Sequence, residues 1–454
     1  MKHSGRIFLG AFALAATFGA GAAVAADDPP CGVVAPNVTC VMKKLDNPRG
    51  LAFGRDGALF VAEAGRGGAI KKNCSGTGLT CYGLTGAVSR LWLGETKRVV
   101  TGLPSISFPA GGSARGPHDI AMRSRWAAES SLLGAGGAHV TVGFEADPAT
   151  RGTSRPDLAK LFHIPDSTLY APSSALCAHD CSRPVVDIGA YERAANPDGF
   201  QFESDPYGLI VDDRRRRGEN EDDGENENED HHGGGHDRAC HDGDDEHGEG
   251  RDNLVVTDAS GNSLLRIDAQ RQISTLAIFP SRGQGRSTDS VPTSVAIGPD
   301  GNYYVGELVG IPFVSLTRPP SNIYRVARAE PHEVTVFLTG FNAIIDMAFK
   351  EGDLYVLQHW TTSPQASPRD GQVIRVHCHG RPLACDGERT TVIGGLDGPT
   401  AMAFGPDGAL YVSHRGASPA FVGGVYMPVG EVLRVDMGNG DDDDDHDHEG
   451  EDEE

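Results

Sequence analysis

Apolar and polar positions alternate along the chain in one recurring order. An apolar run at residues 51–53 leads to a tight turn at Asp56 and Gly57, and a run of β-branched and aromatic residues follows at 59–61. An Asp-Gly pair between alternating apolar runs predicts two antiparallel strands joined by a hairpin. Third and fourth strands are expected at 88–92 and 98–100, so the unit predicts a four-stranded antiparallel sheet.

This unit recurs along almost the whole chain. Copies lie at residues 47–63, 291–307, 344–358 and 398–414, and more divergent copies begin at Gly116 and Asp205. The six expected first strands contain Leu51, Ile120, Leu209, Val295, Met347 and Met402. Repeated four-stranded units of about 50 residues indicate a β-propeller. We therefore predict an all-β fold with six blades.

The two ends of the repeat region predict how the ring closes. The sixth unit stops after its third strand, at Asp436, whereas residues Val38–Leu45 precede the first unit and have the pattern of a fourth strand. Pairing this N-terminal strand into the sixth blade would remove two exposed sheet edges. We therefore predict a six-bladed propeller that spans residues 31–437 and is closed by its N-terminal strand.

The N-terminus has the pattern of a secretory signal. Lys2 and Arg6 precede an apolar run at residues 7–24, and small residues at 23–25 form a cleavage site. The alternative is an uncleaved membrane anchor, but the run is short and Asp27 follows it closely. We predict that residues 1–25 are a signal peptide and that the mature protein is exported to the periplasm or the cell exterior. No other apolar run is long enough to cross a bilayer, so we expect no transmembrane anchor after cleavage.

The formal net charge of −23 is concentrated in two tracts. Residues 212–252 hold 17 acidic and 6 basic residues, and residues 441–454 hold 11 acidic and no basic residues. The rest of the chain is almost neutral and offers no net basic charge to nucleic acid, so we expect no nucleic-acid partner. The composition of the two tracts cannot bury enough apolar surface to fold. We predict a disordered acidic, His-rich insertion at 212–252 within the third blade and a disordered acidic tail at 438–454.

Two interpretations of these tracts remain open. They contain seven of the 17 histidines, namely His231, His232, His236, His241, His247, His446 and His448. Dense Asp, Glu and His side chains can chelate Ca²⁺, Zn²⁺, Cu²⁺ or Ni²⁺ weakly and without fixed geometry. Alternatively, the tracts are solubilising segments whose charges repel one another.

Eight of the nine cysteines form close pairs, which suits an oxidising, exported environment. The pairs are Cys31/Cys40, Cys74/Cys81, Cys177/Cys181 and Cys378/Cys385. Their spacing does not match a structural zinc site, so we predict local disulfides that staple loops. Cys240 is left over within the acidic insertion, either as a free thiol or as an intermolecular partner.

Two rings of positions are expected around the mouth of the central channel. In a propeller of this strand order, the starts of first strands and the ends of second strands share one face. The second-strand ends carry Glu63, Phe144, Asp258, Glu307, Gln358 and His414. The first-strand starts carry Arg49, His118, Tyr207, Thr293, Ile345 and Thr400, with Asp119 and Asp346 one residue further. Our candidates for a ligand-binding face are Arg49, His118, Tyr207, Asp258 and Gln358.

Two interpretations of the acidic positions remain open. In the first, a divalent cation (Ca²⁺ or Zn²⁺) is bound at the axis by Glu63, Asp119, Glu307, Asp346 and His414. Such an ion would polarise a carbonyl group and lower the pKa of a bound water, which suits the hydrolysis of a lactone or an ester. In the second, each acid caps its blade by accepting backbone N–H groups. Recurrence in several repeats favours the second interpretation, and no other cofactor is indicated.

The chain contains seven characteristic short stretches, in this order: residues 47–53 (NPRGLAF), 83–90 (GLTGAVSR), 196–199 (NPDG), 205–209 (DPYGL), 256–262 (VTDASGN), 291–296 (VPTSVA) and 305–308 (VGEL). Taken in order, these stretches resemble the ScyD/ScyE family of secreted bacterial propeller proteins. The resemblance covers roughly residues 37–436 and implies export and a propeller similar to those of the NHL-repeat and SMP-30 type. It implies no defined catalytic residues. The acidic tracts depart from the family pattern, and Gln358 stands where relatives commonly carry an acid.

The sequence contains no complete catalytic set. The G-x-S-x-G, H-E-x-x-H and Walker motifs are absent, and the acid/base candidates His118 and His359 have no partner at a fixed spacing. We therefore expect an exported, monomeric scaffold that binds a small molecule or an extracytoplasmic protein at the channel mouth. The alternative is a metal-dependent lactonase or esterase of SMP-30-like type, so enzymatic activity stays open. A quinone-dependent oxidoreductase is a third hypothesis without a supporting motif.

Overall fold

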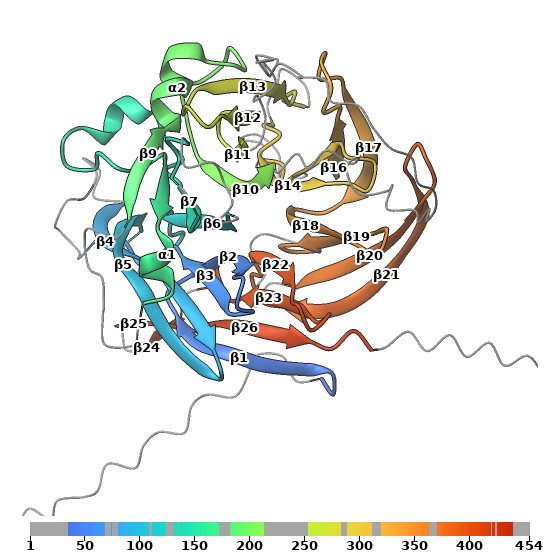
Figure 1. Ribbon diagram of the computed structural model, residues 1–454, viewed down its shortest axis with the longest axis horizontal. Coiled ribbons are helices and arrows are strands. Elements are labelled where there is room, and N and C mark those ends of the chain that lie inside the picture. Colours follow the sequence, from blue (N-terminus) through green and yellow to red (C-terminus); the bar gives the residue numbers. More distant parts are fainter. Residues whose placement is uncertain are drawn as a thin grey trace, which may run out of the picture. The chain divides into compact units, whose positions relative to one another are not determined.

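The repeated units fold into the ring of antiparallel sheets that the sequence predicts (Figure 1). A computed structural model of the protein describes residues 35–438 except 69–73, 75–79, 109–110, 124–130, 135, 172–181, 213–252, 283–287, 311–318, 363–369, 419 and 423–424. Within these residues the strands form six four-stranded sheets and a separate two-stranded hairpin. The innermost strands of neighbouring sheets contact one another in chain order, and the last contacts the first. The chain is therefore an all-β, six-bladed propeller, as predicted.

Four strands that are consecutive in the chain form each of the first five blades. From the axis outward, blade 1 consists of β2 (Pro48–Phe53), β3 (Leu59–Glu63), β4 (Cys81–Trp92) and β5 (Glu95–Ser107). Blade 2 consists of β6 (Pro117–Met122), β7 (Ala138–Val142), β8 (Lys160–Ile164) and β9 (Arg183–Asp187). Blade 3 consists of β10 (Pro206–Asp212), β11 (Asn253–Asp258), β12 (Ser263–Ile267) and β13 (Ile273–Ile278). Blade 4 consists of β14 (Pro292–Ile297), β15 (Tyr303–Glu307), β16 (Ser321–Val326) and β17 (Val334–Phe341). Blade 5 is β18 (Ile344–Lys350), β19 (Asp353–Gln358), β20 (Gly371–His379), β21 (Ala384–Leu396).

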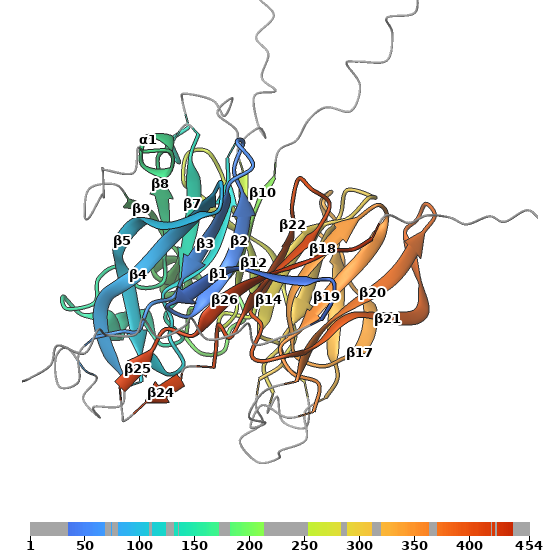
Figure 2. The same cartoon turned by 90° about the horizontal axis from the view of Figure 1, so that it is seen from below.

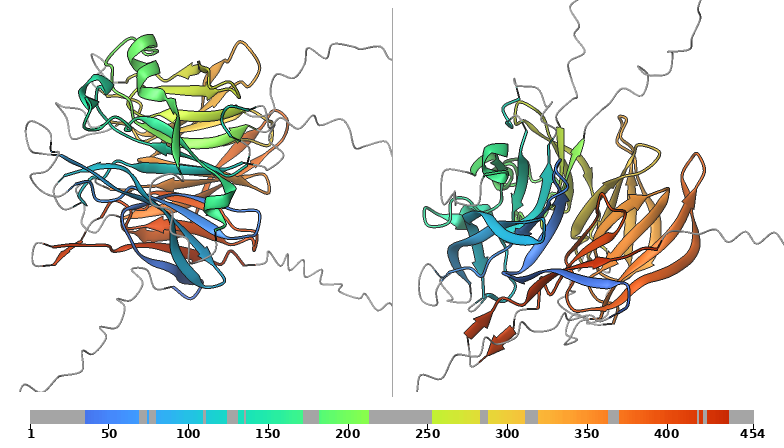
Figure 3. Two further views of the ribbon diagram at one scale, coloured as in Figure 1. Left: turned by 60° about the vertical axis from the view of Figure 1, so that its left-hand side comes forward. Right: turned by 60° about the horizontal axis from the view of Figure 1, so that its bottom comes forward.

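Blade 6 joins the two ends of the repeat region and closes the ring. Its order is β22 (Ala401–Phe404), β23 (Leu410–His414), β26 (Gly430–Val435) and β1 (Val38–Leu45). Figure 2 shows β1 lying beside β26, and the antiparallel register runs from Val38 opposite Val435 to Leu45 opposite Gly430. The predicted closing strand is confirmed with the expected bounds. The hairpin of β24 (Ala420–Val422) and β25 (Val425–Met427) lies outside this sheet and projects from the ring (Figure 3).

The apolar core lies between neighbouring blades. All five residues of β3 are buried, because a blade is covered on both faces by the blades beside it. Between blades 1 and 2, for example, Phe60 and Val88 pack with Ile120 and Val140. This double coverage explains why the inner strands are apolar throughout, and it places their polar residues mainly at the strand ends.

Short helices occur in connections that the repeat does not predict. α2 (Ile188–Ala195) begins at Asp187, whose side chain accepts a hydrogen bond from the N–H of Ala190 (2.8 Å). It ends at Asn196, which adopts the left-handed conformation (φ 41°, ψ 67°). These are ordinary helix start and stop signals, but they lie outside the repeated unit. The helices α1 (Asp166–Leu169) and η2 (Pro148–Arg151) occupy other connections of blade 2.

Several predictions fall wholly or partly outside the described residues. Among the described cysteines, the disulfides Cys74–Cys81 and Cys378–Cys385 are confirmed. Cys31, Cys177, Cys181 and Cys240 lie outside that part of the chain, as do the signal peptide 1–25, nearly all of the insertion 212–252 and the tail beyond residue 438. No helix within the described ranges is long and apolar enough to cross a membrane.

Candidate functional site

The polar side chains at the second-strand ends fasten the blades. Four of them accept a hydrogen bond from a backbone N–H in the segment that leads into the first strand of the same blade. The bonds are Glu63 Oε2 with Asp46 N–H (2.6 Å), Asp258 Oδ1 with Asp205 N–H (2.6 Å), Gln358 Oε1 with Asn342 N–H (2.7 Å) and His414 Nε2 with Asp397 N–H (2.9 Å). Blade 2 carries Phe144 at this position and cannot make the bond. These contacts support the capping interpretation for blades 1, 3, 5 and 6.

Glu63 shows how fully such a residue is engaged. Its side chain is completely buried and accepts hydrogen bonds from Ser89 Oγ (2.6 Å) and from Arg98 Nε (2.9 Å) and Nη2 (2.6 Å). Arg98 also binds Asp46 (2.9 Å), and the bond to Glu63 raises the pKa of the arginine above its usual value. This guanidinium therefore stays charged and neutralises the carboxylate. The oxygens of Glu63 are committed to protein partners.

Glu307 and His414 are engaged in the same way. Glu307 forms an ion pair with Arg282 and accepts hydrogen bonds from Ser290 Oγ (2.6 Å) and the N–H of Asn322 (2.8 Å). His414 accepts at Nε2, so its Nδ1–H donates to Glu431 Oε2 (3.0 Å). Of the five predicted cation ligands, these three are held by their own blades.

Side chains at several first-strand starts link neighbouring blades. Thr293 Oγ1 donates to the carbonyl of Ile344 (2.7 Å), and Thr400 Oγ1 donates to the carbonyl of Pro48 (2.7 Å). Arg49 is buried and donates to the carbonyls of Ala114 (3.0 Å) and Gly416, so it ties blade 1 to both of its neighbours. These contacts run around the axis and hold the inner strands in register.

Asp119 and Asp346 occupy equivalent positions in blades 2 and 5. These blades are three places apart in a ring of six, so the two aspartates lie on opposite sides of the axis. Each accepts one hydrogen bond from the next residue and one from the following blade. The donors are the N–H groups of Ile120 (2.8 Å) and Leu209 (2.7 Å) for Asp119, and of Met347 (2.8 Å) and Met402 (2.7 Å) for Asp346. Both side chains remain partly exposed.

Both carboxyl groups bind a proton more readily than an ordinary aspartate does. Burial raises the pKa of Asp346 to about 7. Burial, followed by the charge of Asp346, raises the pKa of Asp119 well above its usual value. The charge of Asp346 therefore influences the carboxyl group of Asp119 from the other side of the axis. Each can therefore act as a hydrogen-bond donor or as an acceptor.

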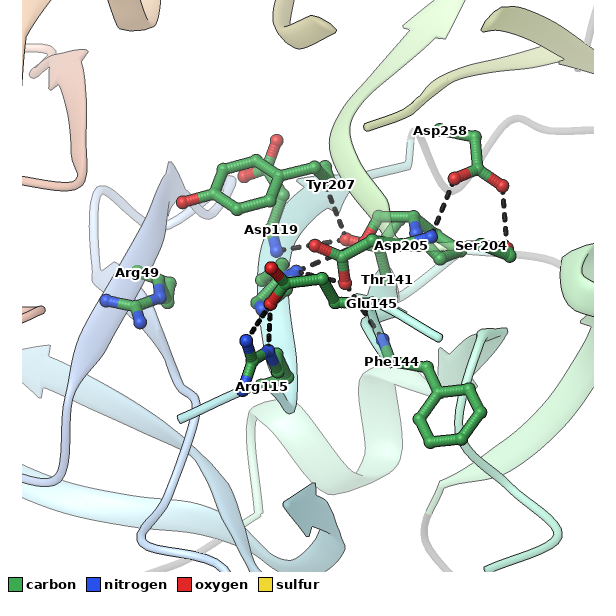
Figure 4. A network of polar contacts seen from close by, with 12 residues as sticks. Arg49, Arg115, Asp119, Thr141, Phe144, Glu145, Ser204, Asp205, Tyr207 and Asp258 are labelled. Carbon is green, nitrogen blue, oxygen red and sulfur yellow. Dashed lines mark hydrogen bonds and ion pairs between the residues drawn. The ribbon is translucent and has the colours of Figure 1, made fainter. Parts of the chain in front are cut away.

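Tyr207 completes the inner part of this site (Figure 4). Its pKa is raised to about 12, mainly by burial, while Arg49 lowers it and Asp205, Asp346 and Asp119 raise it. The hydroxyl stays protonated at neutral pH, and the ring is partly exposed.

His118 lies behind Tyr207 and is held as a neutral imidazole. The two ring centroids are 4.6 Å apart, and His118 Nδ1 donates to the carbonyl of Pro206 (3.3 Å). Burial, and then the charge of Arg49, lower the pKa of His118 well below its usual value. Gly143 permits this packing, because a Cβ there would come within 2.2 Å of both His118 Cε1 and Asp205 Oδ1. His118 therefore supports the site rather than carrying charge in it.

Sequence reasoning missed three polar residues of this face. Asp205 Oδ1 accepts a hydrogen bond from the N–H of Phe144 (2.8 Å), and Arg115 forms an ion pair with Glu145 (Figure 4). Asp205 precedes β10 inside a stretch already noted for its resemblance, so its position was a usable signal. Arg115 and Glu145 lie in the most divergent unit and offered none. We call Asp119, Tyr207 and Asp346, with Arg49, His118 and Asp205 behind them, the mouth site.

The five predicted cation ligands do not form one compact group. Among the described His, Cys, Asp and Glu residues, one set of three has ligand atoms that all lie within 4.8 Å of one another, and it is His377, His379 and Asp386. A cation bound at the axis by all five residues therefore stays a prediction. Of the five, Asp119 and Asp346 belong to the mouth site. His359, an acid/base candidate, is buried and its Nδ1 donates to the carbonyl of Pro399 (2.5 Å).

Comparisons with known proteins indicate similarity of fold at very low sequence identity. No family model and no curated protein matches the chain. Among solved structures, it resembles a protein from Thermus thermophilus proposed to be an oxidoreductase (glucose dehydrogenase), with 15% identity, a TM-score of 0.46, and coverage of 88% of this chain and 99% of that chain. It also resembles virginiamycin B lyase from Staphylococcus aureus, with 12% identity, a TM-score of 0.40, and coverage of 87% and 98%. For the PQQ domain of pyranose dehydrogenase from Coprinopsis cinerea the values are 12%, 0.43, 88% and 94%. Values this low carry no inference about the chemistry of this chain.

Proposed function

We propose that the chain is an exported β-propeller of the ScyD/ScyE type that binds a small, hydroxyl-bearing molecule at the mouth site. One observation carries the proposal. Asp119, Tyr207 and Asp346 are half-buried polar residues on the first strands of three blades, and, besides burial, the charge of Asp346 raises the pKa values of both Asp119 and Tyr207. The polar side chains at the second-strand ends, in contrast, already accept hydrogen bonds within their own blades. Binding groups are therefore concentrated at the axis.

The chemistry of these groups suits a neutral ligand rich in hydroxyl groups. Two carboxyl groups with raised pKa values and one phenol can each donate or accept a hydrogen bond. The ring of Tyr207 adds an apolar surface on which a sugar or polyol ring can rest. Arg49 and His118 are held by backbone carbonyls behind this surface, so the site is preorganised before a ligand arrives.

Metal-dependent hydrolysis is the second candidate, and the opposed carboxyl groups favour it. A divalent cation between Asp119 and Asp346 would displace their protons and polarise the carbonyl of a lactone or ester. Among the described His, Cys, Asp and Glu residues, no third ligand forms a compact group with these two, so water would have to complete the coordination. In this candidate the ion would therefore be bound more weakly, and would keep more water ligands, than in the five-ligand site expected from the sequence.

A ligand screen tests both candidates. Saturation-transfer NMR with monosaccharides, polyols and sugar lactones is expected to detect binding to the wild-type protein. Tyr207→Phe should weaken that binding about tenfold, because it removes one hydrogen-bonding group of about 1–1.5 kcal/mol. Asp346→Asn should weaken it to a similar extent, because the amide has only one acceptor oxygen for the N–H groups of Met347 and Met402 and the side chain must change its orientation. Glu351→Gln is the matched control, because this exposed side chain lies in the turn at the other end of the same blade's inner hairpin.

The alternatives give distinct results in the same screen. Binding that persists unchanged in Asp346→Asn contradicts the mouth site. Lactone consumption that appears only when Ca²⁺ or Zn²⁺ is added, and disappears in Asp346→Asn, identifies the hydrolase instead. If no compound binds the wild-type protein, a hydroxyl-bearing ligand is ruled out and an extracytoplasmic protein becomes the partner to seek.

A further inference from the structure

The outer hairpin of blade 5 brings two histidines and an aspartate together on an exposed surface. The hairpin consists of β20 and β21, whose register pairs Cys378 with Cys385. Alternate residues of a strand point to opposite faces. Cys378 is buried, so His377 and His379 on either side of it share the exposed face. Asp386 follows Cys385 on the partner strand and is also exposed.

We infer that His377, His379 and Asp386 form a binding site for one divalent transition metal ion of the Zn²⁺ or Cu²⁺ class. One ligand atom from each residue lies within 4.8 Å of the other two. The imidazole centroids are 5.9 Å apart, and His379 Nδ1 is 3.5 Å from Asp386 Oδ1. Two imidazoles and one carboxylate are ligands that zinc and copper prefer, and solvent can supply the remaining position.

A fourth side chain orients one ligand toward the metal. Asp353, which is buried, accepts a hydrogen bond from His377 Nδ1 (2.8 Å) and pairs with Arg375. Because the carboxylate can only accept, Nδ1 carries the proton and Nε2 keeps its lone pair. A carboxylate that fixes a histidine in this way is the usual support of a metal-binding imidazole. Asp353 lies on β19, so the support comes from the neighbouring strand of the same blade.

The covalent structure of the hairpin holds the three ligands in place. The disulfide Cys378–Cys385 joins the two strands directly beside all three residues. The ligands therefore have little freedom to lose when an ion binds. A two-strand hairpin with this cross-link presents a fixed surface, in contrast to the loose chelation considered for the acidic tracts.

The site is independent of the mouth site. First strands begin at the mouth, so the turn before Asp353 and the turn between β20 and β21 both lie on the opposite face of the ring. Metal binding at this hairpin can therefore be present or absent without any change in ligand binding at the axis.

Calorimetric titration of the full-length protein with Zn²⁺, after removal of metal with a chelator, tests the inference. We expect one site per chain that is tighter than any binding to the acidic tracts. His377→Ala and His379→Ala should each weaken it by at least about tenfold. Asp353→Asn should weaken it by about 10- to 100-fold through loss of orientation. His332→Ala is the control, because this histidine is half-buried and bound to the carbonyl of Ala327 (3.0 Å).

Two further measurements keep the outcome decisive. The melting temperature of each variant shows whether it is folded, and replacing both Cys378 and Cys385 with Ser should weaken Zn²⁺ binding while leaving the ligands in place. Identical isotherms for the wild-type protein and the His377→Ala/His379→Ala double variant would overturn the inference, because all binding would then belong to other parts of the chain. Absence of binding by the wild-type protein would overturn it as well.

Discussion

Glu63→Ala is expected to lower the free energy of unfolding by about 3 kcal/mol, the low end of the usual effect of breaking a buried ion pair by removing one partner, because the Arg98 side chain is 38% exposed. The substitution leaves the N–H of Asp46 without its acceptor and leaves Arg98 with Asp46 as its one remaining carboxylate partner among the described residues. It also leaves a cavity where the fully buried Glu63 side chain lay. The segment that leads into β2 would lose its main hydrogen bond to β3.

Guanidinium denaturation followed by tryptophan fluorescence measures this effect. Glu95→Ala is the matched control, because Glu95 is exposed on the outermost strand of the same blade and should change the free energy of unfolding by less than about 0.5 kcal/mol. Glu63→Ala protein that unfolds at the wild-type denaturant concentration would show that Glu63 does not fasten the blade. A site role for Glu63 would then be open again.

Glu192→Gln is expected to stabilise the protein above about pH 5, by about 3 kcal/mol at pH 8. Glu192 lies in α2 with 1% of its surface exposed, and neither carboxylate oxygen has a hydrogen-bond partner among the described residues. Burial, followed by the charges of Asp258 and Asp198, raises the pKa of Glu192 to about 8. The folded protein therefore keeps a proton that the unfolded chain releases near pH 4.5.

The sign of the pH dependence follows from these two values. Between about pH 4.5 and pH 8 the folded state binds one more proton than the unfolded state, so wild-type stability falls by about 1.4 kcal/mol per pH unit from this group. Glutamine does not titrate and removes that slope. The gain in the free energy of unfolding is expected to be smaller than the stability that the wild-type protein loses over this pH range, because the buried glutamine amide also lacks hydrogen-bond partners.

Denaturation of both proteins at pH 5, 6, 7 and 8 checks the prediction. The difference between them should be small at pH 5 and grow with pH, while other titrating groups cancel in the comparison. A variant that is less stable than the wild type at pH 8 would contradict it. That result would mean that ionised Glu192 has a favourable partner in solution.

The blades and their closure could be predicted because their signals are local. Alternating apolar runs around Asp-Gly turns mark the inner hairpins, and Val38–Leu45 lies where the sixth blade lacks a strand. α2 could not be predicted from the repeat, because it lies in a connection whose capping residues, Asp187 and Asn196, belong to no repeated position. The repeat pattern therefore predicts the recurring strands but not the segments inserted between them.

The candidate site was only partly predictable. Sequence alignment of the repeats identifies Glu63 and Asp346 as polar positions near the mouth, but it does not separate them. Their roles differ because Arg98, 35 residues away, neutralises Glu63, whereas the donors to Asp346 among the described residues are backbone N–H groups. Such partners lie outside the repeated phrase. The pair His377 and His379 could have been noticed, because histidines at alternate positions of an expected strand share a face.

The central claim is that the axial groups bind a ligand whereas the strand-end acids hold the blades. The most direct test is the dissociation constant of the tightest-binding sugar, polyol or lactone, compared between Asp346→Asn and the double variant Glu63→Gln/Glu307→Gln at a temperature where both are folded. We predict about tenfold weaker binding in Asp346→Asn and an unchanged constant in the double variant. Unchanged binding in Asp346→Asn together with lost binding in the double variant would contradict the account.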